Sequence, residues 1–126
     1  MAAKNFMVGR LRSFRFALRG LAAAVGGQPN ARIHLAAAVL VAAAGLAFRI
    51  SWIEAGFVAS ALVWVAELLN TAIEHVTDLV AQGQHPLAGK AKDVAAAAVL
   101  IAAAYALLMG ASVFGPRVFS MLKAML

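Results

Sequence analysis

Three long apolar stretches constrain the fold of this chain more than any other feature of its sequence. They occupy about residues 30–48, 52–66 and 93–114. Runs of about 20 apolar residues have the length that a helix needs to cross the ~30 Å hydrocarbon core of a bilayer. The mean hydropathy of +0.89 also lies outside the range of soluble globular domains. We therefore predict an all-α integral membrane protein with one membrane domain over residues 1–126.

The residues before the first apolar stretch predict a surface helix over 5–25. Apolar side chains recur there at spacings of three and four, with arginines between them. Such a helix is suited to lie in the membrane interface, with its arginines on lipid phosphates. The formal net charge of +6 is concentrated in this half of the chain. We expect anionic lipid headgroups, and not nucleic acid, to be the partner of this charge.

The predicted surface helix is followed by three predicted transmembrane helices. Gly26, Gly27 and Pro29 break the chain before a first span at 30–48. A tight connection at 49–51 leads to a second helix at 52–80, whose ~43 Å length exceeds the hydrocarbon thickness. After a turn at 82–86, a third span is predicted at 93–114.

The third span is expected to end at Gly115 and Pro116, before a short amphipathic tail. Lysine and arginine residues are commoner in the N-terminal arm and in the loop that carries Lys90 and Lys92. This bias predicts a multi-pass protein with a cytoplasmic N-terminus in the inner membrane of a bacterium.

The cytoplasmic end of the second helix carries an unusual row of polar side chains. Three of the five acidic residues of the chain are Glu67, Glu74 and Asp78. Together with Asn70, they fall within an arc of roughly 80° on one helix face, which Thr71 borders. Carboxylates near bilayer depth are costly, so their alignment indicates a functional site.

The residue types of this site suit phosphoryl transfer. Carboxylate and amide oxygens are ligands that Mg²⁺ prefers, and Lys92 has the charge to meet a phosphate. A remaining carboxylate would accept the proton of an attacking hydroxyl group. Alternatively, Glu67 and Glu74 form salt bridges with Lys90 and Lys92, or Asn70 and Thr71 only join helices. Alternatively, Asp93 only complements the helix dipole at the start of a helix.

The polar motifs resemble those of the small prokaryotic membrane kinases, the diacylglycerol kinase and undecaprenol kinase family. The resemblance centres on Glu-Leu-Leu-Asn-Thr-Ala-Ile-Glu at 67–74 and extends to Asp78. It resumes at His-Pro-Leu-Ala at 85–88 and at Ala-Lys-Asp at 91–93. This string, followed by Ala-Lys-Asp at this spacing, is highly specific.

The resemblance implies a homotrimer that transfers phosphate from Mg-ATP to a membrane lipid alcohol. It implies that Glu67 is the general base and that Glu74 binds Mg²⁺. Asn70, Asp78, Lys92 and Asp93 would complete the polar site, with Lys92 nearest the phosphates and His85 near the nucleotide. These are roles inferred from matching positions.

Two positions depart from the pattern of the family. Gln28 stands where the family commonly has a second metal-binding glutamate, so this ligand would offer an amide oxygen without a charge. Gln84 stands where an aromatic residue often precedes His85. The motifs are more similar to the undecaprenol branch, which makes undecaprenol the favoured acceptor and diacylglycerol the alternative.

Two other classes of function remain as alternatives. A small ion or proton carrier would use Glu67, Glu74 and Asp78 as a relay, but residues 57–66 supply almost no polar route outward. A non-catalytic membrane assembly protein would use the alanine-rich helix faces. The first predicts cation flux without ATP, and the second predicts a stable oligomer that does not bind nucleotide.

Overall fold

The computed structural model describes residues 2–51, 56–81 and 83–126. This part of the chain forms helices and no strand, which confirms the all-α class. The helices are α1 (Ala2–Gly27), α2 (Pro29–Ala47), α3 (Gly56–Val80) and α4 (Pro86–Met125). The predicted start of the second span, at Trp52, lies outside the described residues.

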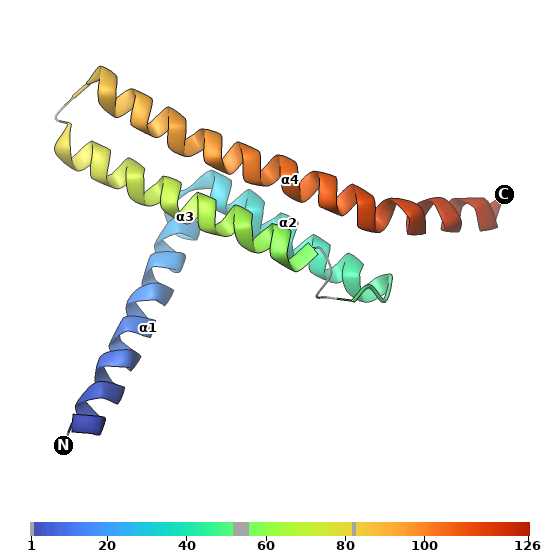
Figure 1. Ribbon diagram of the computed structural model, residues 1–126, viewed down its shortest axis with the longest axis horizontal. Helices are drawn as coiled ribbons and strands as arrows, with labels where there is room; N and C mark the ends of the chain where they lie inside the picture. Colours follow the sequence, from blue (N-terminus) through green and yellow to red (C-terminus); the bar gives the residue numbers. More distant parts are fainter. Residues whose placement is uncertain (1, 52–55, 82) are drawn as a thin grey trace.

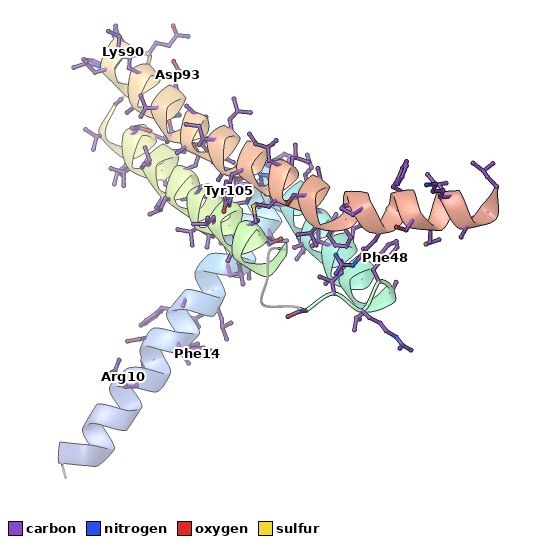
Figure 2. All side chains as sticks on the ribbon, turned by 45° about the vertical axis from the view of Figure 1, so that its right-hand side comes forward. Arg10, Phe14, Phe48, Lys90, Asp93 and Tyr105 are labelled. Carbon is purple, nitrogen blue, oxygen red and sulfur yellow. The ribbon has the colours of Figure 1, made fainter. Side chains whose placement is uncertain are left out.

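The helices form a small bundle from which α1 projects. Figure 1 shows α3 running beside α4, with α2 packed against α3 and α1 leaving the bundle near the start of α2. Phe14 and Arg10 lie on the projecting part of α1 (Figure 2). The described side chains Phe14, Phe16 and Leu18 are 66%, 59% and 51% exposed, as expected for a helix that lies on a lipid surface.

The predicted break between α1 and α2 is present at Gln28, the one non-helical residue between them. Pro29 occupies the first position of α2, where its missing N–H has no helical partner to lose. Arg32 donates hydrogen bonds to the carbonyl oxygens of Val25 and Gly26 at the end of α1. A cation at this end also complements the helix dipole, so Arg32 fixes the junction.

The connection after α2 is a tight C-terminal cap. The Arg49 N–H donates to the carbonyl of Leu46, and the Ile50 N–H donates to that of Gly45. These two bonds form a Schellman motif, in which Arg49 takes the left-handed position with φ of 50°. A non-glycine residue seldom adopts this conformation. The motif supports the prediction of a tight turn at 49–51.

The third apolar helix is longer than the sequence pattern suggests. It begins at Pro86 rather than at Asp93, and His85 caps its start by accepting the Leu87 N–H at Nδ1. It also continues past Gly115 and Pro116 to Met125. Proline removes one helical hydrogen bond, and the helix tolerates this loss by bending (Figures 1 and 2).

Small side chains make up much of the buried core. Of the seven buried apolar residues among the described side chains, four are alanines, namely Ala24, Ala31, Ala59 and Ala95. A Cβ atom at Gly56 would lie 2.8 Å from Cγ1 of Val41, so α2 and α3 approach too closely there for a larger residue. Small residues that let backbones approach are typical of helix packing in membranes.

Large apolar side chains lie mainly on the outside of the subunit. Leu100, Ile101, Leu107 and Leu108 of α4 are each more than 70% exposed. Among the described residues, α2 and α4 are long and apolar enough to cross a membrane.

Candidate active site

Two amide side chains hold the carboxylate of Glu74. The Nδ2 atom of Asn70 donates to Oε1 at 3.1 Å, and the Nε2 atom of Gln28 donates to Oε2 at 3.0 Å. Asn70 lies one turn before Glu74 on α3, whereas Gln28 reaches it from the α1–α2 junction. Gln28 precedes α2 but makes no side-chain cap for it. Its side chain instead connects that junction to α3.

Glu67 lies deeper in the same polar face and is almost completely buried, with 1% of the residue exposed. Within the described part of the chain, its Oε2 atom has no hydrogen-bond partner, and neither do Oδ1 of Asn70 and Oγ1 of Thr71. An unsatisfied buried polar atom costs about 1–3 kcal/mol, so such a group requires a functional explanation. These oxygens are placed to receive a donor or a cation.

His34 is the neighbour of Glu67 that the sequence pattern did not select as a site residue. Its Nε2 atom lies 3.9 Å from Oε2 of Glu67, beyond hydrogen-bond distance. His34 belongs to α2 and Glu67 to α3. Their approach depends on how the two helices pack, and no spacing along one helix reveals it.

A second polar region lies at the turn between α3 and α4. Lys92 of α4 forms a salt bridge with Asp78 of α3, joining Nζ to Oδ1. The two residues line a hollow of about 590 Å³, which has the size of a small-molecule site. Its lining residues are Asp78, Ala81, Gly83, Gln84, His85, Pro86, Ala88, Gly89 and Lys92. The predicted phosphate and nucleotide residues thus lie together.

An apolar groove runs between α3 and α4 and reaches the polar face. Its walls include Leu62, Val65 and Leu69 of α3 and Ala95, Ala98 and Ala102 of α4. Asn70 and Lys90 supply polar groups to its lining. Asn70 therefore touches both the apolar groove and the Glu74 carboxylate.

The sequence profile of the family described as prokaryotic diacylglycerol kinase matches residues 15–114. The match covers Arg15 and Arg19 of α1, the polar face of α3 and the hollow at the turn between α3 and α4. The chain belongs to the prokaryotic diacylglycerol kinase family.

Individual relatives of this kinase carry two substrate names. It is 43% identical to a diacylglycerol kinase of Synechocystis sp. over 95% of this chain and 68% of that protein. It is 39% identical to an undecaprenol kinase of Bacillus subtilis over 84% of this chain and 88% of that protein. A diacylglycerol kinase of Escherichia coli is 54% identical over 32% of this chain and 34% of its own length.

These similarities confirm the resemblance seen in the motifs and make the chain a lipid kinase. A kinase takes its phosphate from ATP. The family and the two membrane-capable helices together make it a membrane protein. The first two relatives are named for different acceptors, diacylglycerol and undecaprenol.

The simpler roles considered for the charged residues of this kinase do not match the structure. Neither Glu67 nor Glu74 pairs with a lysine within the described residues, because Lys92 pairs with Asp78 and Lys90 lies at the groove. Asp93 lies well inside α4, beyond the first turn where a carboxylate stabilises the helix dipole.

Asp93 and Lys92 also face different sides of α4. Lys92 points to α3, and Ala95, on the same side, is buried. Asp93 lies about 200° around the helix from Ala95 and is exposed. Figure 2 shows Lys90 and Asp93 near the first turns of α4. Within one chain, Asp93 is therefore not brought into the polar face.

The donor atoms around Glu74 fit a magnesium ion that also binds phosphate. No group of three His, Asp or Glu side chains suitable for a metal occurs in the residues with described side chains. Mg²⁺ does not need one, since it commonly takes one or two carboxylates and completes its shell with water and phosphate oxygens. The unpartnered Oδ1 atom of Asn70, next to Glu74, is a suitable additional ligand.

Proposed function

We propose that this chain transfers the γ-phosphate of ATP to a membrane lipid alcohol, with undecaprenol as the favoured acceptor. The observation that carries the proposal is the pair Glu67 and Glu74 on one face of α3. Glu67 is buried with an unpartnered oxygen, while Glu74 is held by amides from two parts of the chain. In this arrangement Glu67 is available to accept a proton, and Glu74 is available to bind a metal ion.

In the proposed reaction, Glu67 accepts the proton of the lipid hydroxyl group. The hydroxyl oxygen forms a bond to the γ-phosphorus as the bond to the β-phosphate oxygen breaks, so ADP leaves. Glu74 would hold Mg²⁺, with Asn70 and Gln28 as further oxygen ligands. The ion neutralises phosphate charge when bound. Lys92, held by its salt bridge with Asp78, positions the phosphates in the hollow at the turn between α3 and α4, where His85 would lie near the nucleotide.

The shape of the apolar groove supports a long single-chain acceptor. The groove extends along α4 from Lys90 to Tyr105, which at 1.5 Å per residue is about 22 Å. A polyprenyl tail is one long chain and fits one continuous groove, whereas diacylglycerol brings two chains. Alanines of α4 supply much of the wall, which leaves space for methyl branches.

We propose that three such subunits assemble as a homotrimer in the bacterial inner membrane. Each subunit would have three spans, a cytoplasmic N-terminus and α1 on the membrane surface. The outward position of Asp93 supports this assembly, because Asp93 can join a polar face only from a neighbouring subunit. In a cyclic trimer each site would then combine Glu67 of one subunit with Asp93 of the next.

Direct comparison of acceptors tests the proposed function. Purified protein in bilayer discs is supplied with γ-labelled ATP and either undecaprenol or diacylglycerol, with Mg²⁺ or with a chelator. We expect Mg²⁺-dependent labelling of both lipids, with kcat/KM for undecaprenol about tenfold higher, a difference of about 1.4 kcal/mol. A higher kcat/KM for diacylglycerol would reassign the acceptor. Absence of labelling, together with cation flux in sealed liposomes without ATP, would reject the kinase.

Mixing two inactive variants tests the shared site. Glu67→Gln and Asp93→Asn are each expected to have little activity alone. Co-expressed in equal amounts, they should recover about a quarter of the wild-type activity, because about a quarter of the mixed sites combine two intact residues. Activity no higher than that of the separate variants would show that Asp93 does not act across subunits.

A further inference from the structure

The last part of α4, from Pro116 to Met125, lies beyond the residues that define the family. It is helical and follows a proline, and its large apolar side chains are exposed. Val118, Phe119, Met121 and Leu122 are 42%, 66%, 55% and 56% exposed. This segment, here called the C-terminal arm, has no role in the proposed phosphoryl transfer.

The length of α4 places the C-terminal arm outside the hydrocarbon core. The helix has 40 residues and is therefore about 60 Å long, twice the hydrocarbon thickness. If Lys92 lies at the cytoplasmic interface, the residues up to Pro116 already span about 36 Å. The C-terminal arm then starts at the opposite interface.

The C-terminal arm has two distinct faces. At about 100° per residue, Arg117, Ser120, Lys123 and Ala124 fall within an arc of roughly 120°. Val118, Phe119, Met121, Leu122, Met125 and Leu126 occupy the remainder. A helix with cations on one face and large apolar side chains on the other lies in the plane of a membrane interface.

The proline bend turns the C-terminal arm partly out of line with the span. Figures 1 and 2 show the red end of α4 turning away from the axis of its earlier part, beyond the rest of the bundle. The guanidinium of Arg117 donates to the carbonyl of Val113 at 2.8 Å, one turn back across the bend. The carbonyl that loses its helical donor at Pro116 is that of Ser112, so the Arg117 bond joins the two sides of the bend without replacing the missing bond.

We propose that the C-terminal arm is a second interfacial anchor, which binds anionic phospholipid at the outer leaflet. Its apolar face enters the boundary between headgroups and acyl chains, and Lys123 on its polar face meets lipid phosphates. Charge complementarity and the exposed apolar face both favour this partner. With α1 on the inner leaflet, the arm would fix the depth of the spans from both sides.

The absence of cysteine from the sequence makes a sharp test available. Leu122→Cys and Ser120→Cys put a unique nitroxide label on the apolar and polar faces of the same helical turn. Each full-length variant is reconstituted in vesicles of phosphatidylglycerol and phosphatidylcholine. Collisions of the label with oxygen, which partitions into lipid, and with a water-soluble nickel chelate are measured. We expect the oxygen-to-nickel ratio to be at least several-fold higher at position 122.

Each outcome of this test corresponds to a different environment of the C-terminal arm. A high nickel signal at both positions would mean that the arm lies in water, which overturns the proposal. Low signals from both reagents at 122 would mean that a second copy of the chain covers the apolar face, which also overturns it. Lys123→Gln, or vesicles of phosphatidylcholine alone, should raise nickel access at 122 about twofold. No change would overturn the role of anionic lipid.

This proposal does not rest on phosphoryl transfer. The depth of a label is measured without ATP, acceptor or turnover, so it can fail while the kinase assignment stands.

Discussion

Replacing Glu67 with glutamine is expected to reduce kcat by about 10²–10⁴-fold, the usual contribution of a general base. Glutamine has nearly the same shape as glutamate, but it cannot accept the proton of the lipid hydroxyl group. The KM values for ATP and Mg²⁺ should change little, because Glu74 and Lys92 remain. The measurement is steady-state phosphorylation of undecaprenol in bilayer discs, with ATP, lipid and metal near saturation.

Thr77→Val is a matched control for Glu67→Gln. Thr77 lies on α3, and its hydroxyl group donates only to the carbonyl oxygens of Ile73 and Glu74 in its own helix. This variant should keep nearly full activity. Both variants should elute as the wild-type oligomer and retain their helical content. A Glu67→Gln protein with wild-type kcat would remove the proposed base.

Replacing Glu74 with glutamine should produce a different kinetic defect. The carboxylate of Glu74 accepts two amide N–H groups and is the proposed anionic metal ligand. Its loss removes the negative charge that attracts Mg²⁺. It also leaves a glutamine side chain facing the amide groups of Asn70 and Gln28. We expect the Mg²⁺ concentration for half-maximal activity to rise by about 10²-fold, in line with the several kcal/mol that a bound metal supplies. Excess Mg²⁺ should restore part of the activity.

Replacing Gln28 with glutamate should have the opposite effect on the Mg²⁺ requirement. It adds a carboxylate beside Glu74, so the half-saturating Mg²⁺ concentration should fall about tenfold, because charged ligands strengthen cation sites. Without metal, the two carboxylates repel each other and the melting temperature should fall. If Glu74→Gln changes the metal requirement and Gln28→Glu does not, Gln28 only holds Glu74 in place and does not bind the ion.

Much of the fold follows from periodicity and length alone. The break at Gln28, the tight turn after α2 and the one-sided polar face of α3 are all properties of local sequence. The third apolar helix is less well predicted at its ends. His85 caps α4 and Pro86 begins its first turn. The turn-like composition of these residues hides the start of the helix in the sequence. Pro116 bends the helix instead of ending it, because the apolar pattern on both sides favours continuation.

The sequence likewise predicts only part of the candidate site, because spacing along one helix does not show how separate helices pack. Glu67, Asn70 and Glu74 share one helix, so their spacing reveals the common face. The hydrogen bond from Gln28 to Glu74 and the approach of His34 to Glu67 depend on the packing of separate helices. Asp93 follows Lys92 directly in sequence, yet adjacent residues on a helix point about 100° apart. Motif adjacency therefore does not place both in one site.

The hydrogen bond from Gln28 has a mechanical consequence for the whole subunit. Gln28 is the residue at which α1 meets α2, and Arg32 ties the last carbonyl oxygens of α1 to the same corner. A change in the tilt of α1 must move this corner, and with it the amide that holds Glu74. With α1 in the headgroup layer, as proposed, bilayer curvature and lateral pressure would act through this corner on the carboxylate of Glu74, the proposed metal ligand.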